Sequence, residues 1–399
     1  MRFLTAGESH GPALVVIIDG VPAGLPVAAS SIDRDLARRR VGYGRGGRME
    51  IEADRARIMG GVRHGIATGG PVAIEIENRD HVNWLDTMAV EDRFETRAGA
   101  ADEAWGGSGP AADPRAFTVP RPGHADLAGR LKYGHRDLRD VLERASARET
   151  AARVAAGAVG RLILREIGVE VGSWVESIGG VRANLEPLGA DPGGERARAR
   201  AESAEQSPVR CPDPAVSQEM MDRIDREKEA GGSLGGVFTV AAWGVPPGLG
   251  TYAQWDRRLD GLLAQAVMSI PGIKGVEIGE GFSVAGESGR YAHDEIVVDP
   301  EGGITRATNR AGGIEGGISN GMPILIRAAM KPIPTLRAPT ASVDLATGKP
   351  TLAHAERSDV CAVPAASVVG EAMAALVLAN ACIERYGGDT VDQLRRVRS

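Results

Sequence analysis

The sequence predicts a mixed α+β fold in which two similar halves share one core. Strand-like and helix-like patterns alternate along the 399 residues, and 43% of the residues are hydrophobic, which is enough to build a large core. Short blocks of sequence also recur in the same order in both halves, at a spacing far too long for a solenoid. We therefore expect a single domain over residues 1–399, with halves at about 1–175 and 232–399 that pack about a pseudo-two-fold axis.

The repeat consists of paired blocks that keep their order along the chain. The pairs are GVPAGL at 20–25 with GVPPGL at 244–249, GIATGGPV at 65–72 with GISNGMPI at 317–324, PRP at 120–122 with PIP at 332–334, and RAS at 144–146 with RSD at 357–359. The alternative is that these blocks are common strand–turn sequences that recur by chance. If the repeat is genuine, the two halves form one fused core.

Local patterns predict the individual elements. Alternating and β-branched residues predict strands at 12–18, 71–78, 235–243 and 322–329. Helical patterns predict helices at 31–40, 147–166, 215–230, 255–267 and 365–386. Ser146 and Glu149 have the spacing of a capping box, and Pro364 fits the first turn of the last helix. We expect the polar segment 185–230 to connect the halves and the Gly-rich segment 95–118 to be a loop.

The composition argues against several classes of protein. The 47 Lys and Arg residues against 53 Asp and Glu residues give a net charge of −6, whereas a dedicated nucleic-acid-binding protein is usually basic. The three cysteines lie far apart without CxxC spacing, which argues against a zinc site or a disulfide framework. We see no secretion signal and no apolar run near ~18 residues, so we expect a cytoplasmic protein outside the membrane. P-loop, zincin and α/β-hydrolase motifs are absent, as is GxGxxG in a strand–helix context.

Arginine and glycine are interleaved at 38–48, in the stretch RRRVGYGRGGR. Several guanidinium groups that converge on one pocket suit a small ligand with phosphate and carboxylate groups, and glycine lets the backbone approach such a ligand closely. Two alternatives remain open at this stage, an RNA contact and a solvated basic surface without a ligand.

Two histidines lie where a turn would hold the ring rigidly. His10 stands between Ser9 and Gly11 just before a predicted strand, and His124 lies in the turn RPGHAD at 121–126. Fixed geometry is what a general acid needs, although a structural role is the alternative for both residues. Asp359 lies two residues after Arg357, and a neighbouring cation favours the ionised carboxylate that a base requires.

Two further segments could contact an anionic or planar ligand. The RAS stretch at 144–146 precedes a predicted helix, whose free N–H groups and dipole attract anions. The KPIPT stretch at 331–335 has two prolines, which prevent regular strand pairing and leave a stiff extended segment.

Taken together, these segments resemble the chorismate synthase family. The matching stretches are GESHGPAL, RRRVGYGRGGRM, RPGHAD, RASARET, IKGVEIGEGF, GGIEGGISNGMPI, KPIPT and RSD, in the family's order across nearly the whole chain. The resemblance implies a β-α-β sandwich, with a helical layer between two antiparallel sheets, and a homotetramer. It implies an FMN-dependent lyase of the shikimate pathway. Such an enzyme converts 5-enolpyruvylshikimate-3-phosphate to chorismate and phosphate by 1,4-elimination, with reduced FMN but no net redox change.

The resemblance also implies roles for individual residues. His10 resembles the acid that protonates the departing phosphate, His124 the residue that protonates reduced flavin, and Asp359 the group that helps to remove the C6 proton. The substrate ligands it implies are Arg39, Arg45 and Arg48, with NADPH as the alternative ligand of Arg39 and Arg45. The flavin contacts it implies are Arg144, Ala145, Ser146, Pro271, Gly272, Gly316, Lys331, Pro332, Ile333, Pro334, Thr335 and Arg357.

One pair of these residues departs from the family pattern. Pro271 and Gly272 stand where the family often has Asn-Ala or Gln-Ala, and a proline has no N–H to donate. The chain has no recognisable reductase motif, so we expect an external flavin reductase, and we expect no metal and no nucleic acid. The competing functions are another phosphate-ester lyase and an RNA-binding protein that uses the arginines of 38–48.

Overall fold

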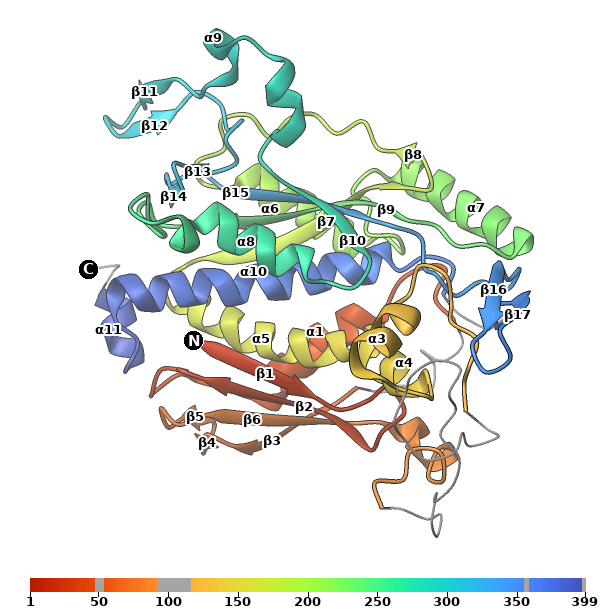
Figure 1. The fold of residues 1–399 in the computed structure, drawn as a ribbon. Helices are drawn as coiled ribbons and strands as arrows, with labels where there is room; N and C mark the ends of the chain where they lie inside the picture. The colour runs from red at the N-terminus through yellow and green to blue at the C-terminus, as the bar shows by residue number, and fades with distance from the viewer. Residues whose placement is uncertain (47–53, 92–115, 355–358, 397–399) are drawn as a thin grey trace.

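Two antiparallel sheets enclose a layer of helices in the computed structural model, which describes residues 1–46, 54–91, 116–354 and 359–396 (Figure 1). The first sheet has the order β1 (Arg2–Ala6), β2 (Ala13–Asp19), β6 (Val72–Glu77), β3 (Ala56–Gly60). The second has the order β10 (Ile273–Ile278), β15 (Ile324–Met330), β9 (Gly236–Trp243), β7 (Glu170–Ile178), β8 (Val181–Arg182). The layer between them contains α1 (Ala29–Arg40), α5 (Thr150–Glu166), α8 (Leu259–Met268) and α10 (Val363–Tyr386). The predicted β-α-β sandwich is confirmed.

The remaining elements lie around these layers. The helices are α3 (Asp126–Tyr133), α4 (Arg139–Ala145), α6 (Glu195–Glu205), α7 (Pro214–Ala230), α9 (Gly289–Ala292) and α11 (Val391–Arg395). The 3-10 turns are η1 (Arg79–Asn83), η3 (Ala147–Glu149), η4 (Trp255–Arg257) and η5 (Gly281–Gly286). The two-stranded pairs are β4 (Val62–Arg63) with β5 (Ile66–Ala67), β11 (Ile296–Val298) with β12 (Ile304–Arg306), β13 (Ile314–Glu315) with β14 (Ile318–Ser319), and β16 (Ala341–Asp344) with β17 (Lys349–Leu352).

The predicted strands and helices are present, with ends that differ by a few residues. The predicted helix over 147–166 divides into η3 and α5, and Pro364 lies in the first turn of α10 as expected. The predicted capping box forms only in part. The Ser146 side chain accepts the N–H of Arg148, but the Glu149 carboxylate binds Thr5 and Arg153 instead of reaching back. Most of the predicted loop at 95–118 lies outside the described residues.

The two sheets repeat one topology. The order β1-β2-β6-β3 corresponds to β7-β9-β15-β10, α1 corresponds to α8, the pair β4-β5 to β13-β14, and α5 to α10. The second unit starts at β7, which is earlier than the expected 232. The polar segment 185–230 therefore interrupts the second unit rather than joining the halves. Its polar composition marks a surface position, and surface segments occur inside repeat units as well as between them.

The helices α5 and α10 form the centre of the core and run parallel. A Cβ added to Gly157 would lie 2.3 Å from the Ala372 Cβ, and one added to Gly160 would meet the backbone of Ala375. Glycine is thus required where the two helices touch. In the described part of the chain, α10 is the one helix long and apolar enough to cross a membrane, but 83% of its apolar window is buried inside the protein. Its composition is explained by its place in the core.

A buried carboxylate holds the helical layer together electrostatically. Glu371 on α10 is 1% exposed and accepts hydrogen bonds from Arg38 at 2.8 Å, Arg161 at 2.5 Å, Arg210 at 3.0 Å and Ser173 at 2.7 Å. Burial raises the pKa of Glu371, but the adjacent guanidinium groups outweigh burial and hold that pKa well below its usual range. The contact ties α10 to α1, to α5 and to β7.

We predict that Glu371→Gln destabilises the protein by about 3–5 kcal/mol, because it leaves buried guanidinium groups without their counter-charge. The urea midpoint followed by circular dichroism measures this effect. Glu384→Gln, on the exposed surface of the same helix, is the control and should change the stability by less than about 0.5 kcal/mol. Equal midpoints for the two variants would contradict the prediction.

We also predict how this contribution depends on pH. A carboxyl whose pKa is lowered in the folded state stabilises the protein above its unfolded pKa of about 4.3 and loses that effect as the pH falls. The difference in unfolding free energy between the native protein and Glu371→Gln should therefore be full at pH 7 and shrink progressively below about pH 4.3. Urea titrations at a series of pH values test this, and a difference that stays constant down to pH 3 would refute it.

Candidate active site

Most of the predicted site residues that the structure describes come together at one end of the helical layer. This is the end at which α5 and α10 begin and next to which α3 and α4 lie (Figure 1). Arg48 and Arg357 lie outside the described residues.

His10 lies in the loop between β1 and β2 and is held by a buried carboxylate. Its Nδ1 is 2.9 Å and 3.0 Å from the two carboxylate oxygens of Glu143 on α4, and its backbone N–H donates to Oε2 at 2.8 Å. The Trp84 ring lies 4.0 Å from the imidazole, centroid to centroid. Burial raises the pKa of Glu143, but the hydrogen bonds from His10 outweigh it and lower that pKa. Nε2 is left without a hydrogen bond among the described residues and is available for proton transfer.

His124 has a similar arrangement in the turn before α3. Its Nδ1 is 2.5 Å from Oδ1 of Asp126, a carboxylate with no exposed surface. The Arg121 guanidinium donates to Asp126 Oδ2 at 2.9 Å and Oδ1 at 3.1 Å. Burial raises the pKa of Asp126, but the hydrogen bonds from His124 and Arg121 outweigh it and place that pKa far below its usual range. The carboxylate therefore fixes the orientation of the ring.

The turn that carries His124 packs against the proline-bearing segment of the other half. The Lys331 ammonium donates to the carbonyl of Gly123, and a guanidinium nitrogen of Arg121 lies 3.5 Å from Thr335 Oγ1. The Lys331 N–H donates to the Gly272 carbonyl at 2.9 Å, which places the Pro271–Gly272 turn beside Lys331–Thr335. The turn that carries His124, the Pro271–Gly272 turn and the Lys331–Thr335 segment are therefore neighbours.

The end of α4 contacts the loop that carries His10. Arg144 donates to the carbonyls of Gly7 at 3.2 Å and Thr5 at 3.0 Å, and its side chain remains 42% exposed. The Ser146 hydroxyl donates to the Ser9 hydroxyl at 3.1 Å, and Ala145 is the last residue of α4. The RAS stretch thus lies directly beside the loop that carries His10.

Asp359 is paired with one of the predicted substrate arginines. Its Oδ2 lies 3.0 Å from Arg45 Nη1, and its Oδ1 accepts the backbone N–H of Gly46 at 2.6 Å. Val360 donates its N–H to the Gly44 carbonyl at 2.8 Å, so the 44–46 and 359–360 segments pair along their backbones. The structure thereby brings an arginine of the first half to an aspartate of the second.

The Asp359 segment is in turn adjacent to the proline-bearing segment. The Leu234 N–H donates to the Val360 carbonyl at 2.7 Å, and the neighbouring Ser233 hydroxyl donates to the Ile333 carbonyl at 2.6 Å. The same chain of contacts therefore connects Asp359 and Arg45 with Ile333, and through Lys331 with His124.

The first arginines of 38–48 bind the protein itself. Arg39 is 4% exposed and donates to Thr150 Oγ1 at 2.9 Å, to the Ala147 carbonyl at 3.1 Å and to Asp54 at 3.4 Å. Arg38 is engaged with Glu371. Over its described part, residues 38–46, the stretch is consequently not one solvated basic surface and shows no exposed arginine stripe of the kind that an RNA contact would need.

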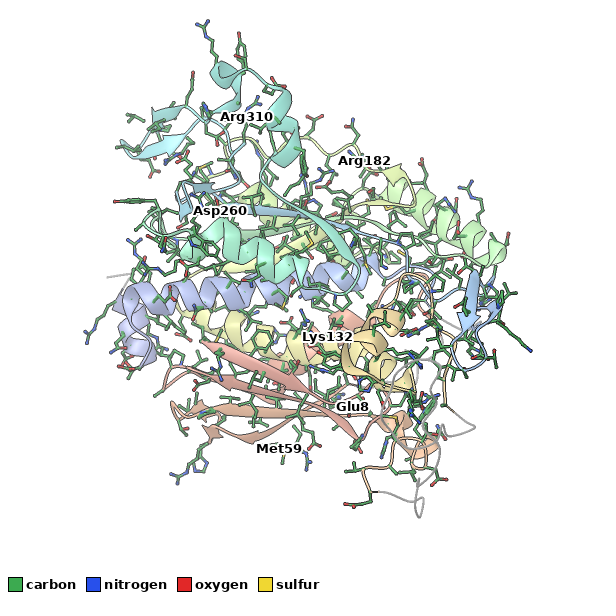
Figure 2. The ribbon with its side chains drawn as sticks, in the orientation of Figure 1. Glu8, Met59, Lys132, Arg182, Asp260 and Arg310 are labelled. Carbon is green, nitrogen blue, oxygen red and sulfur yellow. The ribbon has the colours of Figure 1, made fainter. Side chains whose placement is uncertain are left out.

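Gly316 lies apart from the other predicted flavin contacts. It is in the hairpin β13-β14, next to Gly317, whose carbonyl accepts the N–H of Leu259 at the start of α8. Figure 2 labels Asp260 there, at the opposite end of the helical layer from Glu8 and Lys132. The α10 helix of 24 residues, about 36 Å long, separates the two ends. A single chain does not bring Gly316 to the site.

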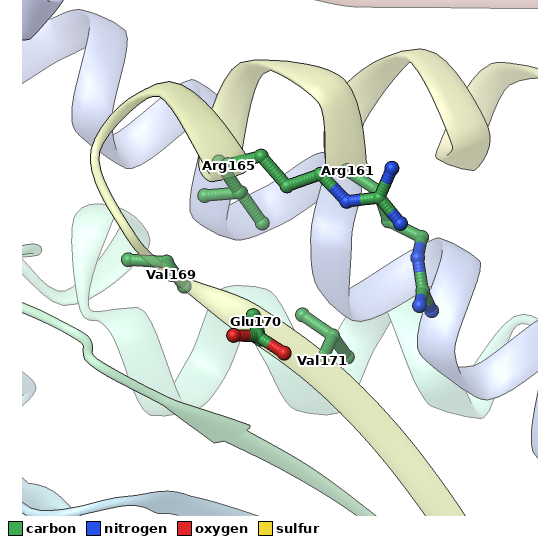
Figure 3. Close-up of a pocket in the computed structure, with 6 residues that line it drawn as sticks. Arg161, Arg165, Val169, Glu170 and Val171 are labelled. Carbon is green, nitrogen blue, oxygen red and sulfur yellow. The ribbon is translucent and has the colours of Figure 1, made fainter. Parts of the chain in front are cut away.

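A cavity of about 30 Å³ lies elsewhere, between the end of α5 and β7 (Figure 3). It is lined by Arg161, Leu164, Arg165, Val169, Glu170 and Val171. That volume is about the share of one water molecule, so it is too small for a flavin or a sugar phosphate. In the part of the chain that the structure describes, no cluster of His, Cys, Asp and Glu side chains is arranged to hold a metal ion.

The sequence reasoning missed the side chains that orient the two histidines. Glu143 directly precedes the RAS stretch, but a glutamate in a polar helix carries no signal of its own. Trp84 lies in a segment for which no element was predicted. Asp126 and Arg121 belong to the quoted RPGHAD turn, where the spacing of Asp126 two residues after His124 was the available signal.

Known proteins are similar to this chain over almost its whole length. A family model described as chorismate synthase matches residues 1–383. The chorismate synthase of Desulforudis audaxviator is 56% identical over 396 residues, covering 99% of this chain and 95% of the relative. That of Symbiobacterium thermophilum is 54% identical over 396 residues, covering 99% and 97%. A solved structure, "Crystal Structure of Chorismate Synthase", superimposes with a TM-score of 0.76 at 43% identity, covering 99% of this chain and 95% of that one.

These matches confirm the resemblance inferred from the motifs. The GESHGPAL, RPGHAD, RASARET and KPIPT motifs lie on segments that the fold brings to one end of the helical layer, whereas GGIEGGISNGMPI lies toward the other end. The chain belongs to the chorismate synthase family, a family of carbon–oxygen lyases of the shikimate pathway.

Proposed function

We propose that the protein converts 5-enolpyruvylshikimate-3-phosphate to chorismate and phosphate. In this 1,4-elimination a proton leaves C6 and phosphate leaves C3, one carbon–carbon double bond is gained, and there is no net redox change. The observation that carries the proposal is the meeting of His10, His124 and the Arg45–Asp359 pair at one end of the helical layer. Family membership supports the same conclusion.

The arrangement suggests how the chain's own residues divide the work. His10, held through Nδ1, donates a proton from Nε2 to the departing phosphate, which leaves more readily when protonated. Asp359 accepts the C6 proton, and Arg45 beside it binds a substrate anion through its guanidinium group. His124 likewise presents Nε2 because Asp126 occupies its Nδ1.

The residues present fit FMN, which this family implies. Lys331 and the partly exposed Arg144 are cations suited to its phosphate, and the segment from Lys331 to Thr335 is stiffened by two prolines. Pro271 offers no N–H, so within the turn at 271–272 only Gly272 has a backbone N–H to donate to the ring. Reduced FMN supplies electron density transiently, without net oxidation. Arg39 is buried among protein acceptors, which favours a substrate-side or structural role over NADPH binding.

We further propose a homotetramer in the cytoplasm that depends on an external flavin reductase. The outer face of the first sheet leaves Leu4, Ile17 and Met59 exposed by 62%, 45% and 55%, which is typical of a surface covered in an assembly. An assembly would also allow the hairpin that carries Gly316 in one copy to lie beside the site of another. Size-exclusion chromatography with light scattering tests this assembly.

We predict that the purified protein forms chorismate and phosphate in equal amounts under anaerobic conditions with photoreduced FMN. Chorismate absorbance and released phosphate measure the reaction. Oxidised FMN with NADPH, and no added reductase, should give no product. Absence of turnover with photoreduced FMN would refute the proposed function, and turnover with NADPH alone would refute the need for a reductase.

We predict that His10→Ala lowers kcat by about 10²- to 10⁴-fold, the usual contribution of a positioned general acid. Affinity for reduced FMN, measured by anaerobic fluorescence titration, should stay within about twofold, because the contacts of His10 are with Glu143 and Trp84. His293→Ala, on the exposed surface after α9, is the control and should keep native kcat. Loss of flavin binding with an unchanged rate per bound flavin would contradict the assignment.

A further inference from the structure

We propose that Glu143 is a positioning residue that fixes His10 with Nε2 as its reacting atom. It acts together with two neighbouring side chains. We call the four residues His10, Glu143, Arg139 and Trp84 the His10 cluster. The inference rests on the proposed function, in which His10 is the proton donor. Nothing in the sequence motifs assigns a role to Glu143, Arg139 or Trp84.

Glu143 binds both the ring and the backbone of His10. Both carboxylate oxygens lie within 3.0 Å of Nδ1, and one of them also accepts the backbone N–H of His10 at 2.8 Å. A carboxylate has no hydrogen to donate, so Nδ1 must carry the proton in this contact. The side chain of Glu143 is 1% exposed and that of His10 is 13% exposed. The tautomer and the direction of the ring are therefore both fixed, with Nε2 free to react.

The other two members hold the ring and the carboxylate in place. Trp84 stacks on the imidazole at 4.0 Å with an angle of 31° between the rings. Arg139 lies over the Trp84 ring at 5.2 Å and reaches Glu143 Oε1 at 3.5 Å. Trp84 is itself anchored by a hydrogen bond from its indole N–H to Asp80 at 3.0 Å. Rotation of the His10 ring would break contacts on more than one side.

Several charged groups lie close to His10 in the fold. The charged and titratable groups that face it are Glu143 and Arg139 on α4, Asp80 and His81 on η1, and Arg144 at the end of α4. Glu143 is the nearest of them and is desolvated, so its charge acts on the imidazole with little screening. Arg139 approaches Glu143 through one long contact and offsets this charge only in part.

A second histidine–carboxylate pair, whose carboxylate also lies on α4, provides a natural contrast. His135 Nδ1 lies 3.3 Å from Asp140 Oδ2, but their side chains are 32% and 59% exposed. Such an exposed pair is screened by solvent and exerts little control over either partner. Asp140→Asn is therefore a matched control for Glu143→Gln, since each removes one charge from α4 beside a histidine.

The kinetic test compares these two variants. Glutamine fills the space of Glu143 but removes its charge and one of its two acceptor atoms. We expect Glu143→Gln to lower kcat at least about tenfold with KM within about twofold, because an incorrectly held histidine fails in proton transfer. Asp140→Asn should match the native enzyme in both respects.

A second readout needs no turnover. Diethyl pyrocarbonate acylates the uncharged imidazole, and peptide mass spectrometry reports the rate at His10 in the protein without substrate. Glu143→Gln should be labelled several-fold faster at His10, because the ring is no longer held by the carboxylate and turns more freely toward the reagent. Arg139→Met, which removes the cation packed on Trp84 and the second contact of Glu143, should also be labelled faster. This variant decides the question even if Glu143→Gln does not fold.

The outcomes separate the two proposals. Unchanged labelling of His10 in Glu143→Gln and Arg139→Met would overturn the positioning role, whatever happens to kcat. A native protein without turnover on photoreduced FMN would overturn the proposed function, while the labelling rates would still decide whether Glu143 controls His10.

Discussion

The close parallel packing of α5 on α10 is the constraint on which the site depends. Gly157 and Gly160 lie where a side chain would collide with Ala372 or Ala375, so the two helices approach closely in one fixed register. Because the helices are parallel, the segments that precede them, 144–149 and 359–362, reach the same end of the layer. Residues of both halves therefore lie at this end, with His10 and Arg45 from the first half and Asp359 and Lys331 from the second.

The same symmetry explains why Gly316 lies far from the other predicted site residues. In each repeat unit the short hairpin, β4-β5 or β13-β14, lies toward the end at which α5 and α10 finish (Figure 1). Gly316 is part of the second hairpin, so the topology that brings the 144–146 segment and Asp359 to one end of the layer places Gly316 at the other end. The separation is a consequence of the repeat and not a local distortion.

The sequence allowed much of this arrangement to be predicted. It did not show which charged residues form buried structural contacts and which lie at the site. The repeated GVPxGL and GIxxGxP blocks indicated the two units. The start of the second unit at β7 was missed because an insertion separates β7 from its repeat block. Arg38 and Arg45 belong to the same arginine-rich stretch, and only tertiary packing distinguishes them. Arg38 binds the buried Glu371, whereas Arg45 binds Asp359. Glu143 had no signal, since its importance comes from its contact with a residue 133 positions away.

The most direct test of this account is a crystal structure of the protein with FMN and substrate bound. We expect the flavin between the 144–146 and 331–335 segments, with the substrate phosphate facing His10 Nε2 and the Arg45–Asp359 pair beside the substrate ring. Ligands bound at the far end of α10, or at a position contacted by one half of the chain alone, would contradict it.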